Sequence, residues 1–286
     1  MRPRLLHALA LAALLSGFAC SDDSTSPSKQ HSSTPPALPP ASTMSIDLGF
    51  PASDQAQASQ QDIRAGKPGP ETLAASADHL NWINAFVRAS FVVLVTADQL
   101  EEPAAAFALA IHSVPQPQDD GSFLWPYIFV DRQTGVEYQI FLYGTRGDET
   151  VVWRMEVSSD DANQPLDHFV WFSGESAKDG HSGYWQFYAP VDATSGTEVS
   201  RIDWQKVRGD QRLTITVNGS GLENEGDVLD FHHTRAQSTI EFFDASAALT
   251  SNITWFADGS GSLTVPDYNG GSKACWDTHQ LDVACE

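Results

Sequence analysis

The sequence predicts a mainly β protein. We expect a single antiparallel up-and-down meander of about eleven strands, curled into a barrel or half-barrel, with one N-terminal helix packed on or in it. In the clearest segment apolar side chains take alternate positions: Val151, Trp153, Met155 and Val157. Such alternation is typical of a half-buried strand. Similar segments recur from Phe123 to Val265, separated by turn residues, and so many twisted strands seldom stay flat.

A helical stripe precedes the strands. Apolar residues recur there at spacings of three and four: Leu73, Ala77, Leu80, Ile83, Val87, Phe91 and Leu94. We expect a helix over residues 71–98, with Pro70 and Glu71 at its N-terminal turn. The run Phe91–Val95 is apolar all round, so it is either an enclosed end of this helix or an extended segment. Residues 104–114 form either a second short helix or the entry to the first strand.

Turn chemistry divides the rest into candidate strands. They are Phe123–Asp131, Val136–Gly144, Glu149–Ser158, Asp167–Ser173, His181–Ala189, Glu198–Val207, Gln211–Asn218, Asp227–His233, Gln237–Asp244, Ser251–Ala257 and Ser260–Val265. Pro126 places the first of them at a sheet edge, because proline cannot donate to a ladder. No Gly or Pro marks a turn at His232–Arg235, so one long bent strand also fits there.

The two faces of this sheet differ. One carries regular apolar pairs such as Trp153 with Met155, Trp171 with Phe169, and Trp185 with Phe187, and we expect the helix to cover it. The opposite face mixes charged residues with aromatic ones. We interpret these aromatic residues as a surface for a ligand or partner: Tyr143, Phe172, Tyr184, Tyr188, Phe243 and Phe256.

Composition limits the classes of function. Of 286 residues, 37 are acidic and 16 basic, so the formal net charge is -21. A chain this acidic repels phosphate backbones, so we expect no nucleic acid partner. The hydrophobic fraction of 41% suffices for a substantial core and excludes a wholly disordered chain.

The N-terminus has the form of an export signal. Arg2 and Arg4 precede an apolar run from Leu5 to Leu15, and small residues lead to Cys20. This segment resembles the signal peptides of bacterial lipoproteins, which end in a lipobox with an obligatory cysteine. The resemblance covers only the leader, and Gly17 and Phe18 depart from the commonest pattern.

The resemblance implies that Cys20 becomes a lipid-modified N-terminus that attaches the protein to a membrane; ordinary signal cleavage, with Cys20 left as a thiol, is the alternative. Ser21, rather than Asp, follows the cysteine, which in enterobacterial lipoproteins favours sorting to the outer membrane. We therefore expect an exported protein anchored in the cell envelope, at the outer membrane.

Three parts are expected along the chain: a signal peptide over residues 1–19, a lipidated cysteine with a tether over residues 20–70, and a folded domain over residues 71–286. From Ser21 to Ser45 the chain is rich in Ser, Thr and Pro, with almost no large apolar side chain to offset chain entropy. Residues 47–70 are interpreted as at most a lightly docked arm.

The remaining cysteines, Cys275 and Cys285, lie near the C-terminus. If Cys20 is lipidated, these two thiols are the ones left in an oxidising compartment, which predicts a Cys275–Cys285 disulfide. The spacing is not Cys-x-x-Cys, so a structural staple is expected rather than a redox site.

No motif assigns a reaction. The histidines lack metal-ligand spacing, Gly-x-Ser-x-Gly is absent, and acidic residues are too abundant to single out a catalytic pair. We therefore assign no catalytic, metal or cofactor residue and favour a non-catalytic envelope module that binds an apolar or amphipathic small molecule inside the curl, or an envelope protein on the aromatic face. The alternatives are a structural surface lipoprotein with a fully packed interior and a carboxylate-dependent hydrolase of an extracellular polymer.

Overall fold

The computed structural model describes residues 34–46, 48–49, 78–97, 100–130 and 135–286. The chain divides into two compact units, residues 1–32 and residues 33–286, and every described residue lies in the second. Cys20 and residues 71–77 of the expected helix lie outside the described residues.

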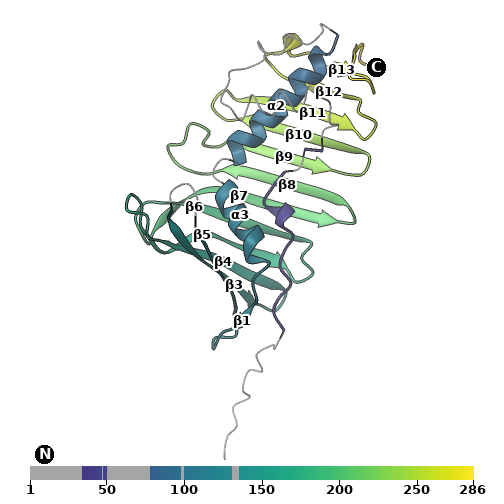
Figure 1. The fold of residues 1–286 in the computed structure, drawn as a ribbon. Coiled ribbons are helices and arrows are strands. Elements are labelled where there is room, and N and C mark those ends of the chain that lie inside the picture. Colours follow the sequence, from purple (N-terminus) through teal and green to yellow (C-terminus); the bar gives the residue numbers. More distant parts are fainter. Residues whose placement is uncertain (1–33, 47, 50–77, 98–99, 131–134) are drawn as a thin grey trace, which may run out of the picture. The chain divides into compact units, whose positions relative to one another are not determined.

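The described unit is one antiparallel sheet of 14 strands, each paired with its neighbours in chain order (Figure 1). The strands are β1 (Gln116–Pro117), β2 (Phe123–Val130), β3 (Glu137–Arg146), β4 (Thr150–Ser159), β5 (Leu166–Ala177), β6 (Ser182–Pro190), β7 (Gly196–Val207), β8 (Asp210–Val217), β9 (Val228–His233), β10 (Gln237–Asp244), β11 (Leu249–Phe256), β12 (Gly261–Thr264), β13 (Ala274–Trp276) and β14 (Asp282–Val283). The meander is confirmed. The sheet is open, because β1 and β14 are its two edges.

The predicted strands correspond to β2 through β12, and the structure adds the short strands β1, β13 and β14. At the ambiguous His232–Arg235 segment the chain turns: Thr234 N donates to Gln237 O at 2.8 Å, and β9 and β10 are separate strands. Pro126 is paired on one side only, as in an edge strand, although β1 rather than β2 is the edge of the sheet. Within the described residues, β1 pairs only with Phe123 and Leu124, so Pro126 lies beyond the paired stretch.

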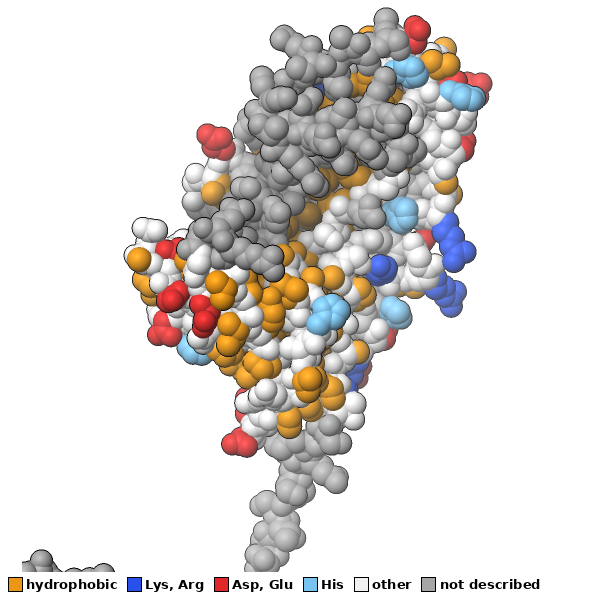
Figure 2. All heavy atoms as spheres, in the orientation of Figure 1, with side chains coloured by type: hydrophobic (Ala, Val, Ile, Leu, Met, Phe, Trp, Pro, Cys, Tyr) orange, Lys and Arg blue, Asp and Glu red, His pale blue; other side chains and the backbone are white. Residues whose placement is uncertain are grey.

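Two helices, rather than one, cover the same face of the sheet: α2 (Leu80–Ala97) and α3 (Glu101–Ala110) (Figure 1). The Phe91–Val95 run stays helical, and residues 104–110 belong to the second helix. α2 packs against β12, β13 and β14, and α3 against β2 and β3. Hydrophobic side chains gather around α3 in the space-filling view of this face (Figure 2). Among the described residues, none of the helices has the length and apolarity needed to cross a membrane.

Residues 34–46 differ from the expected tether, because they lie against the helical face of the sheet. A short 3-10 helix, η1 (Ala41–Thr43), packs against β7 and α3. Trp185 Nε1 donates to Thr43 Oγ1 at 3.1 Å, and Met44 is only 2% exposed. Prolines explain the difference: they limit the conformations of the free chain, so docking costs less entropy than composition alone suggests.

A bulge in β5 reverses part of the predicted alternation. Met155 pairs with Phe172 but Glu156 pairs with Val170, which leaves Trp171 as the extra residue. Phe172 therefore turns toward the helices, where it is fully buried and its ring centroid lies 6.0 Å from that of Phe107. The expectation that Phe172 lies on the solvent-facing aromatic surface is wrong, because a bulge moves every following side chain to the other face.

The candidate binding groove

The face that the helices cover is filled by side chains. At most 2% of the surface is exposed for each of five aromatic residues here: Trp82 and Phe86 of α2, Phe107 of α3, and Trp153 and Trp185 of the sheet. Among the buried indoles, Trp153 Nε1 donates to Ser176 Oγ at 2.9 Å, whereas the Nε1 atoms of Trp82 and Trp204 have no hydrogen-bond partner in the described structure. We call the opposite side of the sheet the outer face.

The remaining predicted aromatic residues are scattered over several strands and do not form one patch. Tyr143 lies under the Arg154 guanidinium at 5.2 Å, and Tyr184 under that of Arg201 at 4.0 Å. Burial, followed by the nearby Glu156 carboxylate, raises the pKa of Tyr143. The hydroxyl groups of Tyr188 and Ser173 are 3.1 Å apart. These three tyrosines are therefore already engaged by neighbouring side chains.

Phe243 and Phe256 have exposed rings, at 38% and 41%. Only Phe256 lines one of two cavities on the outer face. Of the aromatic residues expected to form a binding surface, only Phe256 therefore lies beside one of these cavities.

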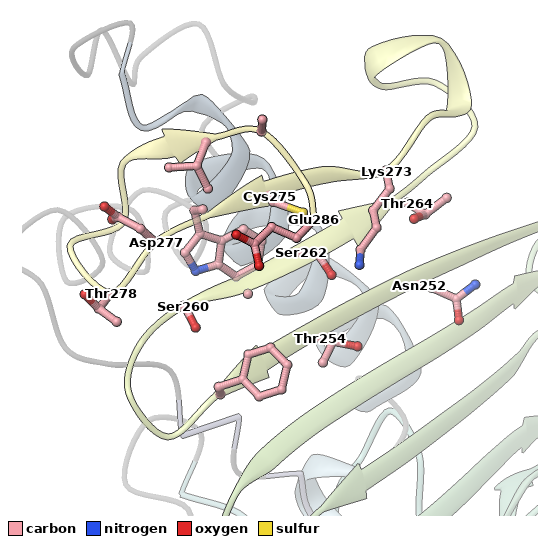
Figure 3. A pocket seen from close by; sticks show the side chains of 15 residues that line it. Asn252, Thr254, Ser260, Ser262, Thr264, Lys273, Cys275, Asp277, Thr278 and Glu286 are labelled. Atoms are coloured by element: carbon pink, nitrogen blue, oxygen red, sulfur yellow. The ribbon is translucent and has the colours of Figure 1, made fainter.

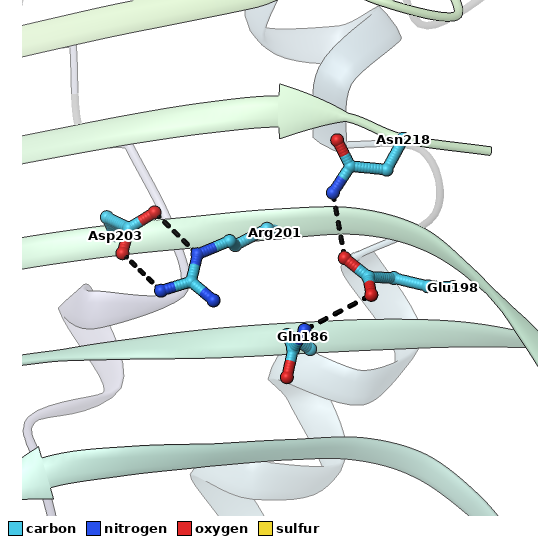
Figure 4. Close-up of polar contacts among 5 residues, drawn as sticks. All are labelled: Gln186, Glu198, Arg201, Asp203 and Asn218. Carbon is cyan, nitrogen blue, oxygen red and sulfur yellow. Dashed lines mark hydrogen bonds and ion pairs between the residues drawn. The ribbon is translucent and has the colours of Figure 1, made fainter.

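The central part of the outer face carries two hydrogen-bonded groups of polar side chains, which we call together the polar ladder: Arg201 with Asp203, and Glu198 with Gln186 and Asn218 (Figure 4). Arg201 donates two hydrogen bonds of 2.7 Å to Asp203, and these bonds raise the pKa of Arg201. Glu198 accepts from Gln186 Nε2 at 3.1 Å and from Asn218 Nδ2 at 2.7 Å. The bidentate geometry and shared carboxylate leave these groups occupied by one another.

A second polar cluster, on β3 to β5, is similarly closed. Glu156 is 8% exposed, and its two carboxylate oxygens face Arg154 Nη2 at 3.0 Å and His168 Nδ1 at 3.1 Å. The His168 ring stacks on Phe141 with centroids 5.0 Å apart. A buried carboxylate needs such partners, so we interpret this cluster as stabilising the fold and not as a binding site.

The outer face of β11 to β14 is different, because it contains a cavity of about 910 Å³, which we call the C-terminal groove (Figure 3). Strand alternation directs its lining outward from three adjacent strands. Asn252, Thr254 and Phe256 come from β11, Ser262 and Thr264 from β12, and Cys275 from β13. The rest of the polar lining is Ser260, Lys273, Asp277, Thr278 and Glu286.

Of the polar side chains that line the C-terminal groove, Ser260, Asp277 and Thr278 have hydrogen-bond partners, and six others have none within the described residues. Within the part of the chain that the structure describes, no hydrogen bond or ion pair engages the side chains of Asn252, Thr254, Ser262, Thr264, Lys273 or Glu286. They offer amide, hydroxyl, ammonium and carboxylate groups, which together can both donate and accept hydrogen bonds. The groove therefore exposes unused hydrogen-bonding capacity, whereas the polar ladder does not.

One wall of the groove depends on the C-terminal disulfide. The Cys275–Cys285 pairing is confirmed, with the two Cα atoms 5.3 Å apart. It holds residues 283–286 beside β13, where Val283, Ala284 and Glu286 line the cavity. The intervening turn is closed by Asp277, which accepts hydrogen bonds from the backbone N–H groups of His279 and Leu281.

The helix on the other side of the sheet also holds this wall. Asn81 Nδ2 of α2 donates to Cys275 O at 2.7 Å, and Asn81 N donates to Asp282 Oδ1 at 2.9 Å. In addition, Trp276 Nε1 donates to Gly259 O at 2.9 Å. These hydrogen bonds hold β13 and β14, which form the edge of the sheet beside the groove.

A second cavity, of about 440 Å³, adjoins the first across β8 to β11. Asn252 and Thr254 line both cavities, so the two are neighbours on the outer face, and we call them together the furrow. The second cavity adds Arg212, His232, Thr239 and Glu241, and His232 Nε2 is buried with no hydrogen-bond partner in the described structure.

Among the described residues, no group of three or more His, Cys, Asp or Glu side chains could hold a metal ion. Sequence reasoning did not find the groove, although a signal was present. The outward positions of two consecutive strands carry small polar residues: Asn252, Thr254, Ser262 and Thr264. The sequence analysis selected aromatic residues on this face and therefore missed them.

Comparison of the chain with models of protein families, with curated proteins and with solved structures finds no match. The function must therefore be argued from the groove itself.

Proposed function

We propose that the protein is an exported, non-catalytic binding module, held at the cell envelope by a lipid on Cys20, that receives a hydrophilic ligand in the C-terminal groove. The observation that carries this proposal is the set of six polar side chains without partners around a cavity of about 910 Å³. This volume is of the size of ligand sites, which usually range from about 300 to 1,000 Å³.

The packing of the sheet bears on the choice between the outer face and the curl. Helix side chains, together with residues 34–46, occupy the apolar face, where Phe107 and Trp185 have centroids 5.5 Å apart. An apolar ligand in the curl would have to displace these contacts and expose their surface to water. The outer face can accept a ligand with no such rearrangement, which favours it over the inside of the curl, where the sequence analysis placed an apolar or amphipathic ligand.

Native mass spectrometry of the protein purified from its own envelope tests the site. We expect a co-purifying ligand that Ser262→Trp abolishes, because an indole at this position fills the groove. Gln205→Trp is the control, since Gln205 is exposed on the outer face outside both cavities. A ligand that survives Ser262→Trp would contradict the groove as the site.

The anchor has a separate test. Cys20→Ala should release the protein from the membrane fraction to the soluble fraction, because the lipid is attached through the Cys20 sulfur. Unchanged membrane fractionation of Cys20→Ala would remove the anchor from the proposal and leave the groove unaffected.

A further inference from the structure

We infer that the C-terminal groove binds a neutral, hydroxyl-rich glycan chain. This inference rests on the proposed function and adds the chemical class of the ligand. Four features support it: the hydrogen-bonding groups of the groove, its exposed aromatic ring, its charge, and the second cavity beside it.

The hydrogen-bonding groups suit a ligand with many hydroxyls. Thr254, Ser262 and Thr264 present hydroxyl groups, each of which can donate and accept, and the Asn252 amide does both from separate atoms. Sugar hydroxyls have the same dual character, so each can pair with this lining whichever way it is oriented. Ligand pockets are usually lined mainly by apolar side chains, and a lining this polar disfavours an apolar molecule.

The aromatic ring adds a platform for an apolar surface. Phe256 is 41% exposed and lines the groove, with the aliphatic side chains of Val283 and Ala284 in the same lining. A pyranose ring has an apolar face of C–H groups, which packs on an aromatic ring while its hydroxyls point sideways. One ring beside a row of hydroxyl and amide groups therefore provides both kinds of contact that a sugar requires.

The charges of the groove favour a neutral ligand. Lys273 contributes one positive charge, and Asp277 and Glu286 contribute one negative charge each, so the lining keeps a small net negative charge, which disfavours an anionic ligand. The chain as a whole has a formal charge of -21, which repels an anionic polysaccharide or an anionic lipid headgroup. A cationic ligand would be attracted to the whole surface, with no preference for this site.

The length of the furrow indicates a chain rather than a single sugar. The second cavity adjoins the groove across β8 to β11 at the shared residues Asn252 and Thr254. It presents further groups with no partner in the described structure, those of Arg212, Thr239 and Glu241. We therefore expect affinity to rise with the number of sugar units until both cavities are occupied.

Calorimetric titration of the full-length protein in detergent tests the inference. The probes are neutral gluco-, xylo-, manno- and chito-oligosaccharides, each as a disaccharide and a hexasaccharide, with hyaluronan hexasaccharide as the anionic comparison. At least one neutral hexasaccharide should bind with a Kd below about 1 mM, more tightly than its disaccharide. Because the ligand is uncharged, its affinity should change less than about twofold on raising the salt concentration.

Two phenylalanines of matched exposure locate the site. Phe256→Ala should weaken hexasaccharide binding roughly tenfold or more. Phe243→Ala should leave it unchanged, because the Phe243 ring is 38% exposed but lies outside both cavities. Asn252→Ala is a second groove variant, and an unchanged urea midpoint confirms that each variant is folded.

The glycan class is overturned if no neutral hexasaccharide binds, if hyaluronan binds more tightly, or if Phe256→Ala and Phe243→Ala behave alike. These outcomes are distinguishable from failure of the proposed function. A co-purified ligand that is lost on Ser262→Trp but is not a glycan leaves the groove as the binding site and removes only the ligand class.

Discussion

The polar ladder and the C-terminal groove lie on the same face of one sheet, yet they use similar side chains in opposite ways. Both contain an asparagine and a glutamate. Asn218 and Glu198 of the ladder are joined by a 2.7 Å hydrogen bond, whereas Asn252 and Glu286 of the groove have no partner within the described structure. Composition is therefore a poor guide to function on this face, and hydrogen-bond occupancy separates a structural region from a candidate binding region.

The difference arises from how the strands end. In the ladder, β6, β7 and β8 are 9, 12 and 8 residues long, and side chains of adjacent strands meet across them. In the groove, β12 to β14 are only two to four residues long, and a disulfide holds the chain beside them. Short strands and a stapled segment leave a hollow that side chains of the sheet do not fill.

The largest expected effect comes from the staple. In the chain-entropy model, a disulfide that closes a loop of this size contributes about 3 kcal/mol to the free energy of unfolding. We expect Cys275→Ser/Cys285→Ser to lose up to that amount in urea unfolding and to abolish hexasaccharide binding. Amide exchange should accelerate in β13 and β14 and stay unchanged in β6 to β8.

If the double variant binds as tightly as the unaltered protein, the C-terminal segment is not a wall of the site. Equal acceleration of amide exchange in β6 to β8 would show that the two regions are one cooperative unit and do not differ in local stability.

A smaller effect is expected from the two glutamates. Glu198 is half-buried and accepts two hydrogen bonds, so Glu198→Ala should lower the free energy of unfolding by about 1 kcal/mol. Glu286→Ala should change it by less than about 0.5 kcal/mol, because surface side chains without partners contribute little. Urea unfolding of the two variants side by side measures the difference, and a larger cost for Glu286→Ala would invert the comparison.

Much of the architecture follows from local patterns in the sequence. The alternation of Trp153 and Met155 and the glycine-containing turns predicted β2 to β12, and the cysteine count predicted the disulfide. Both rest on short-range rules. Errors arose where one residue changes the register, as at Trp171, whose insertion turns Phe172 into the core.

Features that depend on contacts distant in sequence could not be predicted. The docking of Thr43 on Trp185 joins residues 142 positions apart, and no periodicity marks it. The groove likewise requires β11, β12 and residues 283–286 to meet, which only the fold and the disulfide bring about. Of the residues predicted as an aromatic surface, only Phe256 lines the groove, and the groove itself was not predicted.

The most direct test of the central claim is amide chemical-shift mapping of the isotopically labelled full-length protein during titration with the tightest neutral hexasaccharide. We expect shifts in β11, β12, β13 and residues 283–286, extending to β9 and β10 as the second cavity fills. Amides of the polar ladder in β6 and β7 should not move. Shifts confined to the ladder, or to α2 and α3 on the opposite side of the sheet, would contradict the central claim.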